Sequence, residues 1–161
     1  MSRKGNVKKR VKSLSPDPVF ENRLVTRFIN RVMRDGKKTV AQKQVYLALD
    51  LVKNKTSENP VKVFELAIQN VGPRVEVKAR RVGGASYQVP TEVRGDKRVA
   101  LAIRWIIAAA AKLPNKEFHT FAEKLAQELI AASKGEGEAI RKRDVMHKMA
   151  EANRAFAHFR W

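Results

Sequence analysis

The sequence predicts a mainly α-helical fold: a six-helix domain with a protruding two-stranded β-ribbon and a basic N-terminal arm. Six segments repeat apolar residues at the helical spacing of three to four. One segment, about residues 74–91, instead alternates apolar with polar residues around Gly83-Gly84. Residues 1–16 show no hydrophobic period, which is typical of a flexible arm. Because 161 residues is an ordinary size for one domain, we expect residues 17–161 to form a single domain.

The first three helices are predicted from start signals, apolar stripes and stop signals. Asp17-Pro18 is typical of a helix start, with a capping carboxylate before a first-turn proline, and Asp35-Gly36 ends that helix. A second helix is expected from about Thr39 to Lys53. Asn59-Pro60 opens a third, which Gly72-Pro73 ends. The three stripes are Phe20, Leu24, Phe28 and Val32, then Ala41, Val45, Ala48 and Val52, then Phe64, Ala67, Ile68 and Val71.

The loop of the ribbon decides which residues of its two strands face each other. A two-residue Gly83-Gly84 loop would set Arg80 opposite Tyr87 and mix apolar with charged side chains on one face. A loop of three or five residues would set Ala79 opposite Val89, so that the apolar sides coincide. We therefore expect the second register, with a bulged loop in which glycine supplies a positive φ.

Three further helices are predicted after the ribbon. Asp96 can cap the fourth, which is the most apolar and is therefore expected to be central. The fifth ends near Gly135-Glu136-Gly137, and the sixth follows it. Their stripes are Val99, Ile103, Ile106 and Ala110, then Phe118, Ala122, Leu125 and Leu129, then Val145, Met149, Ala152 and Phe156.

The charge of the chain indicates a polyanionic partner. Lys plus Arg is 34 and Asp plus Glu is 16, which gives a net charge of +18. The excess lies in four segments, +6 in residues 1–16, +6 in 23–43, +4 in 74–98 and +4 in 141–161, and residues 17–22 carry −2. Residues 44–73 and 99–140 are neutral. A surface that was basic only for solubility would not segregate its charge in this way, so we expect a nucleic-acid-binding face.

Three motifs place cations where RNA could reach them. On the ribbon, adjacent Arg80 and Arg81 point to opposite faces and the glycine tip is slim, so the ribbon can touch RNA on both sides. Lys37 and Lys38 follow a helix exit and could share one phosphate with the next helix start. Residues 155–161 interleave aromatics with cations, as base stacking requires. The alternatives are a charged surface hairpin, a capped turn with solvated lysines, and a Phe156 that belongs to the core.

Other function classes find little support in the sequence. The absence of cysteine excludes disulfides, thiol catalysis and iron–sulfur clusters. His119, His147 and His158 are scattered, and no nucleophile or phosphate-loop motif occurs, so we expect no metal, no cofactor, no small-molecule substrate and no enzymatic activity. The longest apolar run, Trp105 to Ala111, is too short to span a membrane.

Two rival classes remain for a basic helical protein with a β-ribbon. An architectural DNA-binding protein would carry an apolar wedge near its ribbon tip, whereas here the tip is Gly83-Gly84 and Pro90 lies toward the base. A membrane-surface protein would need a strongly basic helix with bulky interfacial aromatics, and the apolar stripe of the first helix is needed for a core. Sequencing the nucleic acid that co-purifies with the protein would separate these classes.

Three segments together resemble the bacterial-type family of small-subunit ribosomal protein seven. They are Met33 to Lys38, Arg80 to Pro90 and Ala150 to Trp161, and the resemblance extends from about Leu14 to the last residue. The resemblance implies a six-helix domain with a β-ribbon that binds small-subunit ribosomal RNA early and nucleates assembly of the subunit's head. It also implies a place at the subunit interface near the exit-site transfer RNA and the messenger path, contacts with ribosomal proteins nine and eleven, and a cytoplasmic or organellar ribosome.

The resemblance also assigns residues to two RNA-facing surfaces. The ribosomal-RNA surface is expected to comprise cations of the arm, the first helix exit, the ribbon and the segment after it: Arg3, Lys4, Lys8, Lys9, Arg10, Lys12, Lys37, Lys38, Arg74, Lys78, Arg80, Arg94 and Arg98. The surface toward transfer RNA and messenger is expected to comprise the ribbon tip and part of the last helix: Arg81, Val82, Gly83, Gly84, Ala85, Ser86, Arg141, Lys142 and Arg143.

Overall fold

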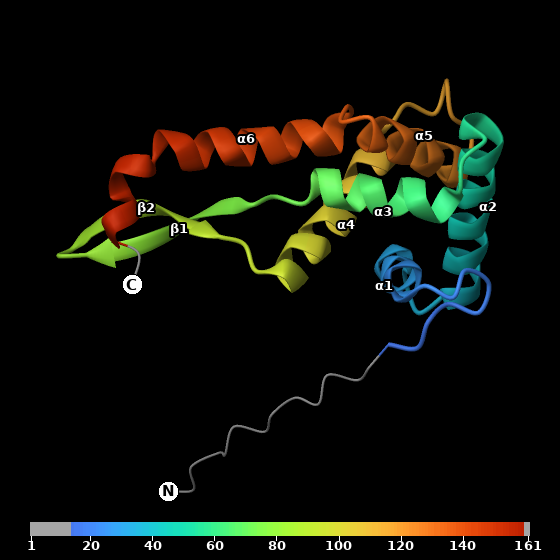
Figure 1. Cartoon of the computed structure of the whole chain (residues 1–161), viewed down its shortest axis with the longest axis horizontal. Coiled ribbons are helices and arrows are strands. Elements are labelled where there is room, and N and C mark those ends of the chain that lie inside the picture. Colours follow the sequence, from blue (N-terminus) through green and yellow to red (C-terminus); the bar gives the residue numbers. More distant parts are fainter. Residues whose placement is uncertain (1–13, 160–161) are drawn as a thin grey trace, which may run out of the picture.

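The computed structural model describes residues 14–159, and within them the predicted fold class is confirmed. The basic residues 1–13, and with them most of the predicted arm, lie outside the described residues. Six α-helices and one antiparallel hairpin are present (Figure 1). The elements are α1 (Arg23–Val32), α2 (Lys38–Thr56), α3 (Pro60–Val71), β1 (Val75–Val82), β2 (Ala85–Glu92), α4 (Gly95–Lys112), α5 (Phe121–Ser133), α6 (Glu138–Ala152) and a 3₁₀-helix, η1 (Arg154–Phe159).

The hydrophobic core lies among α1 to α5 and the start of α6, at the opposite end of the molecule from the ribbon tip (Figure 1). Helix α5 packs against α2, α3 and α4, and α4 also packs against α1 and α6. Phe28 and Phe64 meet edge to face at its centre, with ring centroids 5.2 Å apart. The predicted stripe residues Ile103, Ile106 and Ala110 of α4 are all buried in this core. No helix among the described residues is both long and apolar enough to cross a membrane.

The first helix begins later than Asp17-Pro18 predicts. Asp17 caps a separate turn, because its Oδ2 accepts hydrogen bonds from the backbone N–H groups of Val19 and Phe20. Glu21 then takes a positive φ of 49°, which a helix cannot contain, and α1 starts at Arg23 behind the cap Asn22. The Asp17 carboxylate is buried and also accepts a 2.7 Å hydrogen bond from the Tyr46 hydroxyl. Burial and this carboxylate raise the pKa of Tyr46 to about 12.

Two other predicted starts also shift. Helix α4 begins at Gly95 with Arg94 at the cap position, so Asp96 lies in the first turn instead of capping it. Helix α5 begins at Phe121 after a reciprocal capping box between Thr120 and Glu123, which leaves Phe118 outside the helix.

The ribbon register differs from the expected one. Arg80 lies opposite Tyr87 and Lys78 opposite Val89, which is the register of the two-residue loop. Gly83 and Gly84 have φ values of +57° and +90°, and two successive positive φ values are typical of a type I′ turn, whose twist matches that of the strands. The prediction of a bulged loop was wrong because it assumed that apolar and polar residues alternate along the whole ribbon. At the base, Val89, Pro90 and Thr91 are all buried, so both faces are covered and alternation carries no register information there.

The predicted stripe of the sixth helix is also wrong. Val145 and Met149 are 51% and 57% exposed, and the buried residues of α6 are Ala139, Ile140 and Ala150. Phe156 lies beyond α6, in η1. Helix α6 leaves the core and runs along the ribbon (Figure 1), so most of its length meets a thin two-stranded sheet instead of a broad apolar surface. The predicted stripe has helical spacing, but the face of α6 that is buried is a different one.

Candidate nucleic-acid interface

The base of the ribbon is fixed by an ion-pair cluster. The Glu76 carboxylate is buried on β1 and lies 2.5 Å from Lys97 Nζ and 3.3 Å from Lys78 Nζ. Burial acts to raise the pKa of Glu76, but hydrogen bonds from Lys97 and Lys78 and their charges hold that pKa below its ordinary value. Lys78, predicted to contact ribosomal RNA, therefore has an internal partner, although half of its side chain stays exposed.

Arg98 joins α4 to the end of α3. Its Nε and Nη2 donate hydrogen bonds of 3.0 and 3.2 Å to the backbone carbonyls of Gly72 and Gln69. These carbonyls have no partner within the helix, and a cation is favourable at this negative end of the helix dipole. A Cβ on Gly72 would come within 2.8 Å of Arg98. The predicted RNA contact at Arg98 thus belongs to a side chain that also holds the fold together.

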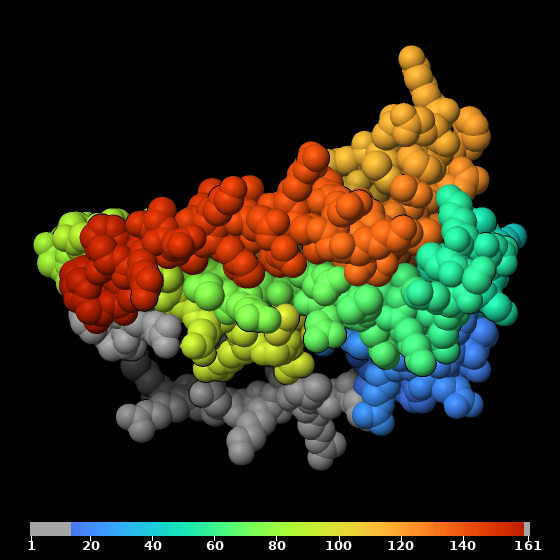
Figure 2. Space-filling view, turned by 45° about the horizontal axis from the view of Figure 1, so that its top comes forward, coloured from blue at the N-terminus to red at the C-terminus, as the bar shows by residue number. Residues whose placement is uncertain are grey.

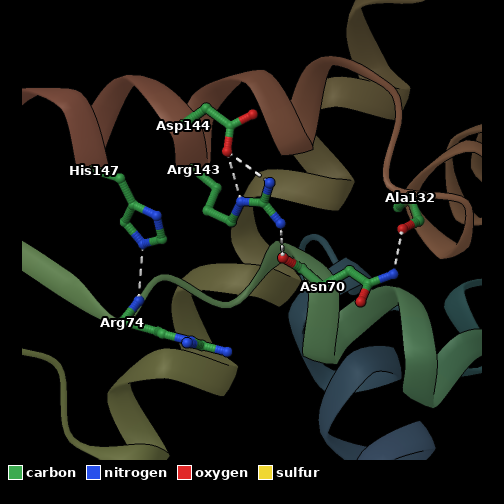
Figure 3. A network of polar contacts seen from close by, with 6 residues as sticks. All are labelled: Asn70, Arg74, Ala132, Arg143, Asp144 and His147. Atoms are coloured by element: carbon green, nitrogen blue, oxygen red, sulfur yellow. Dashed lines mark hydrogen bonds and ion pairs between the residues drawn. The ribbon is translucent and has the colours of Figure 1, made fainter.

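Helix α6 is tied to the core and to the ribbon by a polar network (Figure 3). The Arg143 guanidinium donates a 2.7 Å hydrogen bond to the carbonyl of Asn70 and pairs with Asp144 at 2.6 Å. The Asn70 side chain in turn donates to the carbonyls of Ala132 and Ser133 in α5. This network therefore links α3, α5 and α6, and it uses one of the residues predicted to face transfer RNA, Arg143.

The other two α6 cations are arranged differently from Arg143. Arg141 makes a 3.7 Å ion pair with Glu138 and its side chain is 82% exposed. Lys142 Nζ lies 6.0 Å from the centroid of the Trp105 ring, within the range of a cation–π contact. The guanidinium of Arg141 is therefore far more accessible to a polyanion than that of Arg143, whose side chain is 26% exposed.

The tip of the ribbon is exposed and slim. Arg81, Gly83, Gly84, Ala85 and Ser86 are exposed, and no atom lies within 4 Å of the Cβ positions of the two glycines. Arg80 is half-buried and lies opposite Tyr87, whereas Arg81 is exposed and lies opposite Ser86. Successive side chains of a strand point to opposite faces, so the two guanidinium groups flank the ribbon as predicted. The tip projects beyond the rest of the described chain (Figure 1).

The aromatic residues near the C-terminus pack on the ribbon. The Tyr87 ring lies 5.3 Å from the Phe156 ring and 4.9 Å from the Phe159 ring, between centroids. Two of the aromatics in the predicted stacking segment therefore contact β2 instead of the helical core. Figure 2 shows α6 and this C-terminal segment as one continuous surface along the ribbon. Arg160 and Trp161 lie outside the described residues.

The exit of α1 presents two exposed lysines at the start of α2. Asp35 and Gly36 both take positive φ values, and the backbone N–H of Lys37 closes the turn on the carbonyl of Arg34 at 2.9 Å. Lys37 and Lys38 are exposed, and no side chain caps α2. Together with Arg74, Arg80, Arg81 and Arg94 they form the free cation set: predicted contacts that make no ion pair with a carboxylate among residues 14–159.

Sequence reasoning missed the residues that position these cations. Glu76, Asn70 and His147 hold the ribbon base and α6 in place. Lys124 and Glu128 are buried on α5, and they follow Phe121 by three and seven residues. That spacing places both residues on the apolar side of the helix, so the sequence did contain a signal that they are buried. No spacing rule pairs Glu76 with Lys97 or Asn70 with Arg143.

Comparison with known proteins identifies the family of this chain. The family model for ribosomal protein S7p/S5e matches residues 2–154. Three bacterial relatives, each called small ribosomal subunit protein uS7, align over all 161 residues of this chain and all of their own: those of Hyphomonas neptunium at 53% identity, Mesorhizobium japonicum at 54% and Pelotomaculum thermopropionicum at 52%. The resemblance seen in the three sequence motifs is thereby confirmed. The family model covers nearly the whole chain and the relatives align over their full length, so the chain belongs to the S7p/S5e family of small-subunit ribosomal proteins, which are parts of a ribonucleoprotein that works in translation.

Proposed function

We propose that this chain is a structural, non-enzymatic protein of the small subunit that binds ribosomal RNA directly and nucleates assembly of the subunit's head. The observation that carries the proposal is the free cation set. Unpaired cations repel one another in the free protein and gain most when phosphates neutralise them. Family membership makes ribosomal RNA the polyanion to expect. The basic arm, residues 1–16, extends the same surface by charge, and residues 17–161 act as one RNA-binding domain.

Within this proposal the two ends of the ribbon differ in role. The base is tied to α4 by the Lys97–Glu76 ion pair and to α6 by His147, and it offers Arg74, Lys78 and Arg94 to ribosomal RNA. The slim tip, residues 81–86, together with Arg141, faces the exit-site transfer RNA and the messenger path. A fixed base and a projecting tip support this division, because a ribbon anchored at one end can hold its tip at a constant place.

Protein neighbours are expected on α6. Val145 and Met149 are large apolar side chains exposed one turn apart on this helix. Exposed apolar patches on a ribosomal protein are suited to contacts with other proteins, which supports the implied contact with ribosomal proteins nine and eleven. The setting that follows is a ribosome, cytoplasmic or organellar.

A binding comparison tests the proposal. The full chain would be titrated with a transcript of the part of small-subunit ribosomal RNA that forms the head, with a scrambled transcript of equal length, and with duplex DNA. We expect the ribosomal transcript to bind at least about 1,000-fold more tightly than the other two, as specific complexes do. Equal affinity for all three would reduce the protein to a non-specific polycation and contradict the proposal.

A further inference from the structure

The ribbon is long and thin, so the place of its tip depends on where the ribbon is held. From Arg74 to Gly83 the first strand and its turn extend over about 30 Å, at about 3.3 Å per residue. The sheet has two strands among residues 14–159, and a two-stranded ribbon alone is marginally stable in water. A pivot of about 20° at the base would displace a tip at this distance by about 10 Å.

The base of the ribbon is held by two polar contacts. The Glu76 carboxylate pairs with Lys97 of α4, and the backbone N–H of Arg74 donates a hydrogen bond to His147 of α6. Both contacts lie at the same end of β1, so together they act as a single point of attachment. A body that is attached at one point can still pivot about it. These contacts therefore locate the base without determining the direction of the tip.

A second attachment lies closer to the tip. The ring of Tyr87 on β2 lies 5.3 Å from the ring of Phe156 and 4.9 Å from that of Phe159, between centroids. Both distances are typical of favourable aromatic pairs, and we call these three rings the aromatic clasp. Tyr87 lies opposite Arg80, which places the clasp about 20 Å along the ribbon from Arg74. Two attachments that far apart fix a direction, which one attachment does not.

Helix α6 connects the aromatic clasp to the core. Its start belongs to the hydrophobic core, and Arg143 donates a 2.7 Å hydrogen bond to the Asn70 carbonyl of α3. The helix ends at Asn153, whose side chain donates a 2.7 Å hydrogen bond to the Met149 carbonyl, and η1 then packs against β2. Because α6 runs along the ribbon between these two ends (Figure 1), it acts as a brace from the core to the outer half of the ribbon.

The aromatic clasp is a contact at the surface and not a part of the core. No residue of η1, Arg154–Phe159, is buried, and Tyr87 is half-buried. The clasp lies on the ribbon, whereas the hydrophobic core lies at the other end of the molecule, so losing the clasp leaves the core intact. The ring surfaces of Phe156 and Phe159 that meet Tyr87 are also not available for stacking on unpaired bases. These rings are therefore better suited to holding the ribbon than to reading RNA.

We propose that Tyr87 is a positioning residue for the ribbon tip. Its contacts with Phe156 and Phe159 hold the ribbon in one direction along α6, and so determine where Arg81 and the glycine turn lie. The contacts join ring to ring, so phenylalanine at position 87 preserves them and alanine removes them. The positioning concerns the protein alone, whereas its consequence for transfer RNA rests on the proposed function.

The first test measures the direction of the ribbon in the free full-length chain. The sequence contains no cysteine, so Ser86→Cys at the tip and Lys62→Cys on α3, both at exposed positions, introduce a single pair of spin labels. Pulsed electron resonance then gives the distribution of distances between the labels. We expect a narrow distribution for the labelled parent and for Tyr87→Phe, and a distribution about twofold broader or more for Tyr87→Ala. The matched control is Gln88→Ala, an exposed neighbour on the other face of β2, which should match the parent.

A second variant removes the aromatic clasp and leaves the sequence of the ribbon unchanged. Phe156→Ala combined with Phe159→Ala should broaden the distribution as Tyr87→Ala does, and adding Tyr87→Ala should broaden it no further, because the interaction is already lost. Magnetic resonance contacts between Lys78 and Val89 show whether the strands are still paired. A paired ribbon with the parent's distribution would overturn the inference. An unpaired ribbon would overturn it as well, because the clasp would then fold the ribbon and not direct it.

The second test measures the effect of the tip's position in the subunit. Small subunits reconstituted with Tyr87→Ala should assemble their heads as the parent does but retain exit-site transfer RNA about 10-fold less well, and Tyr87→Phe should restore retention. Parent-like retention by Tyr87→Ala would overturn the consequence for transfer RNA, and a loss with Tyr87→Phe would overturn the role of the ring contacts. If the parent fails to bind the head transcript, the proposed function fails, and the distance measurement still decides whether Tyr87 positions the tip.

Discussion

His147 of α6 accepts a 3.0 Å hydrogen bond through its Nε2 from the backbone N–H of Arg74, at the residue that precedes β1 (Figure 3). The acceptor must be a neutral imidazole nitrogen, because both nitrogens of an imidazolium are donors. The contact joins the long C-terminal helix to the start of the ribbon, so the protonation state of one side chain affects how the ribbon is anchored.

The first prediction follows from this contact. Burial lowers the pKa of His147, and the charges of Arg143, Arg74 and Arg98 lower it further, against Asp144, which raises it. The unfolded chain therefore binds more protons than the folded chain between this lowered pKa and the ordinary value of about 6.5. The stabilisation is fully present above that ordinary value and is lost as pH falls through the lowered pKa. Urea denaturation should show the free energy of unfolding decreasing as the pH is lowered through this range. The decrease should be less steep for His147→Gln. Equal slopes for the parent and His147→Gln would show that the titration of His147 does not contribute to the pH dependence of stability, which would contradict the prediction.

The second prediction separates two neighbouring cations of α6. Arg143→Ala removes the donor to the Asn70 carbonyl and should cost about 1–3 kcal/mol in the free energy of unfolding. Arg141→Ala removes only an exposed pair with Glu138 and should change it by less than about 0.5 kcal/mol. Chemical denaturation of both variants provides the comparison. If Arg143→Ala also lost less than about 0.5 kcal/mol, the network in Figure 3 would contribute nothing measurable to the free energy of unfolding.

The third prediction concerns the core. Ile103 is 1% exposed in the middle of α4, so Ile103→Ala should cost roughly 2–5 kcal/mol through lost burial and the cavity left behind. Leu66→Ala is the surface control, and should cost well under half as much because nearly half of Leu66 is exposed. The measurement is the denaturation midpoint at constant slope. A loss below about 1 kcal/mol for Ile103→Ala would place the core elsewhere.

The fourth prediction concerns the ribbon tip. Gly83 and Gly84 both have positive φ, so replacing both with valine should strain the turn by about 1–2 kcal/mol per residue while the helical core still folds. Small subunits reconstituted with this variant should assemble their heads but retain exit-site transfer RNA poorly. The companion variant, Arg80→Ala with Arg81→Ala, keeps the turn and should weaken RNA contacts on both ribbon faces. Chemical probing of assembly and transfer-RNA retention are the two readouts. Parent-like behaviour of the valine variant in both would leave the tip as an ordinary surface turn.

The fifth prediction concerns the arm. Residues 1–12 carry six cations and no acid. Deleting them should leave the melting temperature nearly unchanged, but should reduce the slope of log affinity against log salt by roughly 4–5 units, at about 0.7–0.9 per phosphate contact. Filter binding to the ribosomal transcript over a salt series measures this slope. An unaltered slope would exclude phosphate binding by the arm.

The elements whose limits depend on local chemistry could be read from the sequence. Asn59 caps α3 as predicted, with Pro60 at its first position, because a cap needs only a side chain and the next few backbone N–H groups. The two glycines at the ribbon tip have positive φ for the same local reason. The three motifs were enough to recognise the family, since motif order along the chain is itself a property of the sequence.

The faces of these elements were decided by tertiary contacts. Val145 and Met149 have helical spacing in the sequence, yet they are exposed because α6 buries Ala139 and Ile140 in the core at its start and then runs along a narrow ribbon. The ribbon register followed the turn and not the apolar alternation, because packing on both faces of its base removes the difference between inside and outside.

The candidate site shows the same division. The sequence by itself determined which cations exist and that they gather in four segments. It could not determine that Arg98 would be engaged inside the protein while Lys37 and Arg81 remain without a carboxylate partner, since Arg98 donates to carbonyls 26 and 29 positions before it in the chain. Nor could it bring Tyr87 to the rings of Phe156 and Phe159, because they lie on elements far apart in the chain. Period and capping depend on neighbours in sequence, whereas burial and ion pairing depend on neighbours in space, and only the folded chain supplies those.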